Sequence, residues 1–237
     1  MSEIAPFWLP GEAPQFLSRT GVQYARLPFS QALIDRGLEN NRLNQLAENL
    51  PKGAFVSGGF MNAVMLGQVE KASDIDLFFS SEEAFLKTYD MLCDPGKENG
   101  TSCLQGYKPE VDKETLLKIS KELRFVKFKH EEFPPIQLVK LVWYESAEHV
   151  IDSFDLTVVQ FATDGEDLVF NPIAMVDLAR KRIVLHRMQF PTSTLRRLVK
   201  YAKKGFYACP GSLQRICLEV EKSIRENPGA EQFAYID

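Results

Sequence analysis

The stretch GAFVSGGFMNAVMLGQVEKASDIDLFF, residues 53–79, decides the fold. An apolar run ends at Gly58-Gly59, a short helical pattern follows, and a second apolar run contains Asp74 and Asp76. Apolar runs of this length, bounded by turn residues, predict strands, so the order is strand, glycine turn, helix and strand. This order predicts an α/β chain in which backbone amides and two carboxylates meet at one end of a sheet. A nucleoside triphosphate with its Mg²⁺ ions requires such a site.

The two aspartates form the first candidate metal site. Side chains alternate along a strand, so Asp74 and Asp76 share one face, where two like charges are costly without a positive partner. Their oxygens suit Mg²⁺ or Mn²⁺, although a solvated strand end would explain them equally well in isolation. The glycine turn fifteen residues upstream favours the site. Its amides predict triphosphate binding by Ser57, Gly58 and Gly59.

A third carboxylate would complete a two-metal site, which stabilises both the attacking and the leaving oxygen of an in-line displacement. Asp155 is the best candidate, because it lies between Phe154 and Leu156 in an apolar run that predicts a strand at 151–162. Asp152 is the alternative, although a polar residue at the start of a strand needs no further explanation.

A basic helix is predicted at 192–206, TSTLRRLVKYAKKGF, where five cations lie opposite an apolar face. Arg197 and Lys200 are one turn apart, so the two side chains could bind one ligand together. The helix as a whole predicts a contact with an anion, either a triphosphate or the phosphates of RNA or tRNA, whereas for any single cation a solvated face is the simpler interpretation.

Composition limits the function classes. The net charge of the 237 residues is −4, so a polyanion site has to be a local patch. The four cysteines include no CxxC pair, which indicates a reduced, cytoplasmic protein. The N-terminus has no signal-peptide pattern and no apolar run could span a bilayer, so no membrane partner is expected.

Three regions are predicted: an extended N-terminal arm at 1–30, an α/β domain at 31–171 and a helical extension at 172–237. The arm is rich in proline and aromatic residues and is a possible contact for a protein partner. Helices are predicted at 31–49, 60–66, 81–93, 112–123, 174–181, 192–206 and 212–226. Strands are predicted at 54–57, 74–79, 124–129, 136–144, 151–162 and 168–170, with a short extended piece at 183–186.

Several of these stretches together resemble a known family, the nucleotidyltransferase superfamily of DNA polymerase β. The closest likeness is to the head and neck of tRNA CCA-adding enzymes and bacterial poly(A) polymerases. The stretches that carry it are Gly58-Gly59, VMLG at 64–67, DIDL at 74–77, FDLTVVQFATDG at 154–165, MVDLARKRIVLH at 175–186 and LRRLVKYAKKGF at 195–206. The resemblance implies a mixed β-sheet flanked by helices, with a C-terminal helical extension.

The resemblance also implies site residues. Asp74, Asp76 and Asp155 would be the catalytic carboxylates and the ligands of Mg²⁺. The glycine pair would hold the triphosphate of an ATP-like substrate, and Arg197 with Lys200 would flank the nucleotide.

The sequence departs from the family pattern at three positions. Asn62-Ala63 stands where the family has arginine-aspartate, and Phe154 stands where it has arginine. The sequence ends soon after the neck-like helix, which favours a small transferase of the kind found in phages, toxin–antitoxin pairs or mobile elements over CCA addition.

The predicted function is transfer of a nucleoside monophosphate from an NTP to an acceptor hydroxyl, such as the 3′ end of RNA or tRNA, with release of pyrophosphate. The alternative is a catalytically degenerate protein of the same fold, acting as a nucleotide- or RNA-binding or structural module. A third possibility is a toxin-like or antitoxin-like transferase whose acceptor is a protein or tRNA.

Overall fold

The computed structural model describes residues 24–34, 46–93, 106–118 and 124–226. The chain forms two compact units. A sheet unit comprises Tyr24–Asp152 and Phe161–Phe170. A helical unit includes Ser153–Gln160 and Asn171–Asp237, as far as these are described. The predicted regions 1–30, 31–171 and 172–237 stay predictions, and most of the arm lies outside the described residues.

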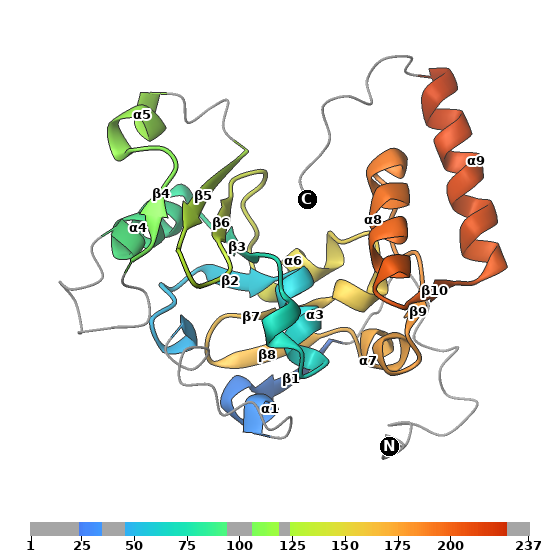
Figure 1. Ribbon diagram of the computed structural model, residues 1–237, viewed down its shortest axis with the longest axis horizontal. Helices are drawn as coiled ribbons and strands as arrows, with labels where there is room; N and C mark the ends of the chain where they lie inside the picture. Colours follow the sequence, from blue (N-terminus) through green and yellow to red (C-terminus); the bar gives the residue numbers. More distant parts are fainter. Residues whose placement is uncertain (1–23, 35–45, 94–105, 119–123, 227–237) are drawn as a thin grey trace. The chain divides into compact units, whose positions relative to one another are not determined.

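The sheet unit is built on a mixed sheet of eight strands in the described residues, in the order β1-β8-β7-β2-β3-β6-β5-β4 (Figure 1). The strands are β1 (Ala25–Pro28), β2 (Ala54–Ser57), β3 (Ile75–Phe79), β4 (Lys108–Pro109), β5 (Phe125–Lys129), β6 (Ile136–Val139), β7 (Phe161–Thr163) and β8 (Asp167–Phe170). Its helices are α1 (Phe29–Ile34), α3 (Gly59–Met65), α4 (Glu82–Cys93), α5 (Lys113–Lys118) and α6 (Ala147–Asp152). Strands β3 and β6 run parallel, and the other neighbours are antiparallel.

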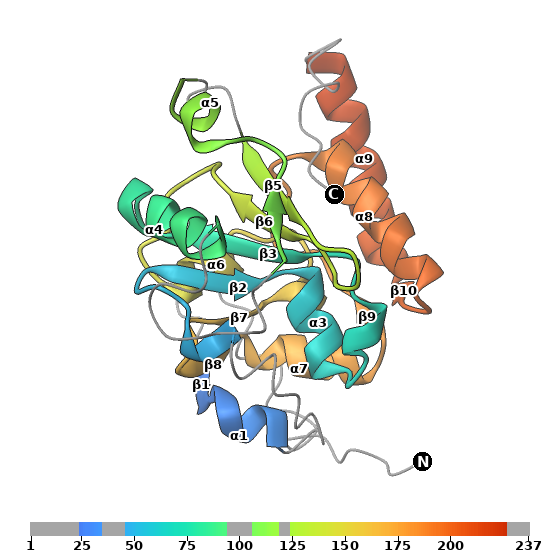
Figure 2. The same ribbon diagram turned by 60° about the vertical axis from the view of Figure 1, so that its left-hand side comes forward.

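Helices α3 and α4 cover one face of this sheet (Figure 2). Val56 of β2 pairs with Leu77 of β3, so both side chains lie on this face. Phe79 points the same way and meets Phe85 of α4, with ring centroids 5.3 Å apart. This apolar contact fixes α4 against the middle of the sheet.

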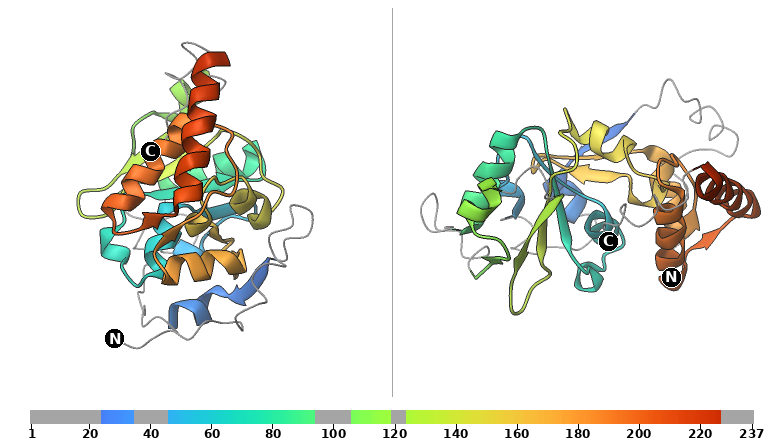
Figure 3. Two further views of the ribbon diagram at one scale, coloured as in Figure 1. Left: turned by 90° about the vertical axis from the view of Figure 1, so that its right-hand side faces the viewer. Right: turned by 90° about the horizontal axis from the view of Figure 1, so that it is seen from above.

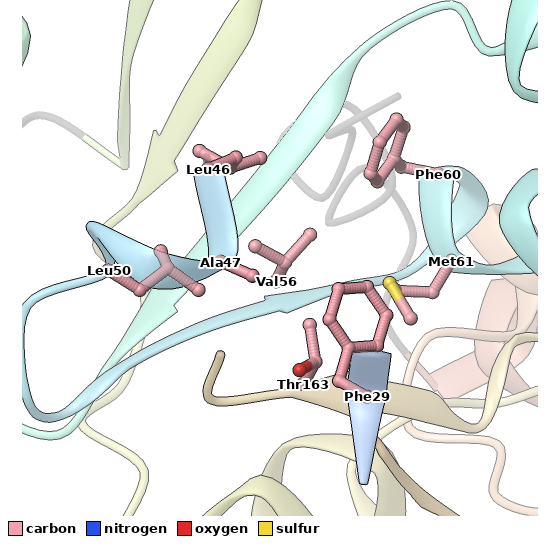
Figure 4. Close-up of a pocket in the computed structure, with 8 residues that line it drawn as sticks. All are labelled: Phe29, Leu46, Ala47, Leu50, Val56, Phe60, Met61 and Thr163. Atoms are coloured by element: carbon pink, nitrogen blue, oxygen red, sulfur yellow. The ribbon is translucent and has the colours of Figure 1, made fainter. Parts of the chain in front are cut away.

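Helices α1 and α3 border a small apolar pocket on the same face (Figure 4). Its lining consists of Phe29, Leu46, Ala47, Leu50, Val56, Phe60, Met61 and Thr163. Because α3 buries its apolar side here, the turn that precedes it is held at the end of β2.

Helix α6 covers part of the opposite face. Phe78 points away from α4, and its ring centroid lies 5.7 Å from that of Tyr144. The Tyr144 ring lies 5.5 Å from His149 of α6. Asp76 is two residues from Phe78, so its side chain also lies on this second face.

The helical unit contains three described helices, α7 (Pro172–Ala179), α8 (Pro191–Lys203) and α9 (Pro210–Glu226). Helices α8 and α9 lie side by side (Figure 3). Short strands β9 (Arg182–Ile183) and β10 (Tyr207–Ala208) pair in parallel. No helix in the described part of the chain has the length and apolarity needed to cross a membrane.

Most predicted elements are confirmed, including the strand, glycine turn, helix and strand over residues 53–79. The predicted strand at 151–162 is wrong. Helix α6 extends to Asp152, a 3-10 turn spans Thr157–Val159, and only Phe161–Thr163 is a strand. This run is apolar because it is buried in irregular structure, with Leu156 and Val158 both 0% exposed.

Other predicted elements differ in their bounds. The strand at 136–144 ends at Val139, and the helix at 112–123 is described only from Lys113 to Lys118. Within the predicted helix at 31–49, α1 ends the first described stretch at Ile34 and residues 46–48 are again helical, whereas residues 35–45 lie outside the described residues. Helix α8 begins at Pro191, because proline suits the first helical position, rather than being capped by Thr192.

The turn between β7 and β8 offers a test of how tightly the sheet is packed. Gly165 has φ +100°, and a Cβ there would lie 2.3 Å from the carbonyl oxygen of Ala47. We expect Gly165→Ala to lower the free energy of unfolding by about 2 kcal/mol more than Gly67→Ala, because overpacking adds to backbone strain. Gly67 is the matched control, since it has φ +66° with no atom within 4 Å. If urea denaturation showed that both variants lose the same free energy of unfolding, the close contact between Gly165 and Ala47 would be contradicted.

Candidate functional site

The glycine turn and one carboxylate of the sheet unit lie against each other. Ser57 and Asp76 are partners in the antiparallel pairing of β2 with β3. Gly58 follows with φ 78° and ψ −143°, and a Cβ on it would lie 3.2 Å from Oδ2 of Asp76. Because a side chain at position 58 would face both strain and this oxygen, the turn requires glycine.

Asp74 lies one residue before β3, and two donors orient its carboxylate. The hydroxyl of Ser73 donates to Oδ1 at 2.8 Å, and Nε2 of Gln137 donates to Oδ2 at 3.3 Å. Asp74 therefore precedes the start of β3, two residues from Asp76, and the shared metal site of the two aspartates stays a prediction.

Gln137 is a site residue that the sequence analysis did not identify. It lies in β6, is the parallel partner of Asp76, and is only 4% exposed. Its Oε1 is buried and accepts no hydrogen bond from any described residue. The one available signal was a polar residue inside the apolar run Ile136–Val139, and the parallel pairing could not be predicted from the sequence.

These oxygens fit a hard divalent cation. Two carboxylates and a buried amide oxygen are donors of the kind that Mg²⁺ binds, and Mg²⁺ commonly keeps several water ligands beside few protein ligands. Among the described residues, no three His, Cys, Asp or Glu side chains gather at one point. A cation here would therefore be held by Asp74 and Asp76, with Gln137 next to them.

Ser57 lies inside the sheet rather than on its surface. It is 0% exposed, and its hydroxyl donates to the carbonyl oxygen of Phe161 at 2.7 Å. The hydroxyl is therefore committed to joining β2 with β7, and binding of a nucleotide by Ser57 stays a prediction. Asn62 and Ala63, where the resembling family has a charged pair, are 2% and 8% exposed within α3.

Asp155 belongs to the helical unit, where it contacts α8. Its Oδ2 accepts a hydrogen bond from the hydroxyl of Thr194 at 2.7 Å and forms an ion pair with Nη1 of Arg197. Asp155 is 8% exposed, so its carboxylate is largely shielded from water, whereas 33% of the Arg197 side chain is exposed. The structure thus brings together two predicted site residues, Asp155 and Arg197, but as partners of each other. Their roles in metal and nucleotide binding stay predictions.

The remaining cations of α8 lie at its surface. Lys200 is half-buried one turn beyond Arg197, whereas Arg196 and Lys203 are exposed. Lys204 follows the helix, with Nζ 5.3 Å from the centroid of the Tyr201 ring. Part of the predicted basic face is therefore exposed, and its contact with an anionic partner stays a prediction.

A second buried carboxylate, Asp177 of α7, shows how the helical unit is held together. It accepts hydrogen bonds from Thr157 at 2.5 Å and from Nε of Arg182 at 2.8 Å. Burial raises the pKa of the Asp177 carboxyl above its ordinary value, although both donors act in the opposite direction. Asp177 therefore ties α7 to the segments on either side of it.

A family model matches much of the chain. The model for the Gabija anti-defense 2 family protein, Gad2, covers residues 29–181, more than half of the 237. The match includes the glycine turn, both aspartates of β3 and Gln137. No curated protein sequence matches the chain.

Solved CCA-adding enzymes share the fold. One solved with ATP is 16% identical with a TM-score of 0.59, covering 85% of this chain and 48% of that chain. One solved with CTP is 16% identical with a TM-score of 0.58, covering 85% and 47%. The Thermotoga maritima enzyme, complexed with tRNA, is 18% identical with a TM-score of 0.55, covering 85% and 47%. At these identities the similarity shows the nucleotidyltransferase fold alone, and this chain spans about half of each structure.

The role of Gln137 can be tested by adding a charge. We expect Gln137→Glu to lower the free energy of unfolding by about 1 kcal/mol without metal, because a third carboxylate would adjoin Asp74 and Asp76. Mg²⁺ should reverse this loss and raise Tm more than in the wild type. The control is Gln68→Glu, at a half-buried position where the side chain accepts a hydrogen bond from Nζ of Lys71. Failure of Mg²⁺ to stabilise the Gln137 variant would argue against a cation site.

A double-mutant cycle tests whether Asp155 is structural. We expect Asp155→Asn and Arg197→Gln each to destabilise the fold, with a coupling energy of about 1 kcal/mol because the two side chains are in contact. Urea denaturation gives the four stabilities. A coupling energy near zero, together with loss of Mg²⁺ binding in Asp155→Asn, would instead support Asp155 as a metal ligand.

Proposed function

The chain belongs to the Gabija anti-defense 2 family. We propose that it acts in anti-defence as a metal-dependent nucleotidyltransferase. It would move a nucleoside monophosphate from an NTP to an acceptor hydroxyl and release pyrophosphate. The observation that carries the proposal is the Gly58 turn against Asp76, close to Asp74 and Gln137, on a sheet of the nucleotidyltransferase type.

Asp74 and Asp76 would hold Mg²⁺ or Mn²⁺. The cation, when bound, supplies positive charge that neutralises the triphosphate and lowers the pKa of the acceptor hydroxyl. Ser73 and Gln137 fix the direction of the Asp74 carboxylate through the two hydrogen bonds described above. Gly58 leaves space beside Asp76, so that the polyphosphate can approach the backbone of the turn.

The acceptor oxygen would form a bond to the α-phosphorus. The bond from the α-phosphorus to the oxygen that bridges it to the β-phosphorus would break, and pyrophosphate would leave with that electron pair. The protein contributes mainly by positioning the two reactants and by stabilising charge, as is general for phosphoryl chemistry. Whether Asp155 takes the acceptor proton stays a prediction, since its carboxylate is paired with Arg197 in this structure.

Of the acceptors considered, RNA is the one that the exposed basic face of α8 supports best. Among the structures that share the fold, the Thermotoga maritima CCA-adding enzyme is complexed with tRNA, and others contain ATP or CTP. We propose RNA phosphates as the partner of this face, with the 3′ hydroxyl as acceptor. The anti-defence role further suggests a phage-encoded protein that acts in the cytoplasm.

A second candidate is a nucleotide- or RNA-binding module without turnover. It is favoured by Asn62 and Ala63, which place no charge in α3, and by the pairing of Arg197 with Asp155. Calorimetry with Mg²⁺ and each NTP separates the two candidates, because tight binding without pyrophosphate release would support the module.

The catalytic proposal predicts the effect of one substitution at β3. With labelled NTPs, Mg²⁺ and total RNA, we expect Asp76→Asn to reduce labelling at least about 100-fold, because several kcal/mol of charge stabilisation are lost. Asp90→Asn is the control, since Asp90 is exposed on α4 and pairs with Lys113 at 2.6 Å. Wild-type labelling that survives unchanged in Asp76→Asn would refute the transferase proposal.

A further inference from the structure

We infer that Lys127 of β5 binds the phosphates of the nucleotide, an inference that rests on the proposed function and adds a residue to the same site. The starting observation is the register of the sheet. Asp76 pairs with Gln137, and Gln137 pairs in turn with Lys127. Paired residues project from the same face, so the three side chains form one row. The row crosses β3, β6 and β5, which are neighbours in the sheet (Figure 1).

The neighbours of Lys127 confirm which face it occupies. Val126 and Phe128 are 1% and 0% exposed. Phe128 meets Tyr89 of α4, with ring centroids 5.2 Å apart. Lys127 alternates with these two residues, so it projects from the face opposite α4, which is the face of Asp76. Lys127 is half-buried, so part of the residue is exposed to solvent.

Lys127 also differs from the lysine nearest to it in the strand. Lys129, two residues on and on the same face, pairs with Glu110 at 2.6 Å. Lys127 forms no ion pair with any described residue, so its charge is available to a ligand. The buried amide of Gln137 lies between Lys127 and the carboxylates. The Oε1 atom of Gln137 accepts no hydrogen bond from the described residues.

The spacing suits a polyphosphate with its cation. Neighbouring strands are about 4.8 Å apart, so the backbone at Lys127 lies roughly 10 Å from that at Asp76, two strands away. A lysine ammonium on its flexible stem can bridge part of this distance and acts as a point charge for phosphate. At one end of the row, Asp76 would help to hold the cation. At the other end, the Lys127 ammonium would contact a phosphate that the cation does not neutralise.

The test is calorimetry of Mg²⁺-dependent binding of ATP, inorganic tripolyphosphate and adenosine to the full chain. We expect Lys127→Gln to weaken binding of ATP and of tripolyphosphate about tenfold, as for one lost charge-assisted hydrogen bond, and to leave adenosine unchanged. Lys127→Arg should bind within about threefold of the wild type, because it keeps the charge. Lys129→Gln is the matched control and should bind as the wild type does.

The outcomes separate this inference from the proposed function. Wild-type binding that is lost in Asp76→Asn but unchanged in Lys127→Gln would overturn the role of Lys127 and leave the transferase proposal standing. Equal weakening by Lys127→Gln and Lys129→Gln would also overturn it, because a general charge effect would suffice. No binding of any triphosphate by the wild type would overturn both. Thermal melts of each variant confirm that the fold is intact.

Discussion

The pairing of β2 with β3 is the constraint on which the candidate site depends. It sets Ser57 opposite Asp76, and the next residue, Gly58, has to turn away with positive φ directly beside the carboxylate. The chain can then enter α3, whose apolar side packs onto the face of the sheet away from Asp76. The pairing of β2 with β3 therefore separates the apolar face of the sheet from the face of Asp76, and it places the Gly58 turn next to the Asp76 carboxylate.

The sequence predicted this part of the fold because its signals are local. Two apolar runs, a glycine pair and a short helical pattern lie within 27 consecutive residues, and each predicts its own element. Asp74 and Asp76 could be placed beside the turn for the same reason. Gln137 and Lys127 could not, because their positions follow from strand order and register, which pair residues far apart in the chain.

The apolar run around Asp155 shows a different limit. Periodicity cannot distinguish a buried strand from a buried irregular segment, and residues 153–160 are irregular apart from a 3-10 turn. A charge inside an apolar run requires a partner. The structure supplies one in Arg197 and Thr194, both forty or so residues later in α8. Arg197, which was predicted to flank the nucleotide, forms an ion pair with Asp155 in the structure.

The parallel pairing of β3 with β6 has a consequence for folding. Parallel strands require a long crossover, and the hydrogen bond from Gln137 to Asp74 joins residues 63 positions apart. Closing so large a loop costs chain entropy before the contact repays it, so contacts of this type form late. The glycine turn and β3 can assemble early from adjacent sequence, whereas Gln137 and Lys127 arrive only when the crossover is complete. A partly folded chain would therefore carry both aspartates with neither neighbour in place.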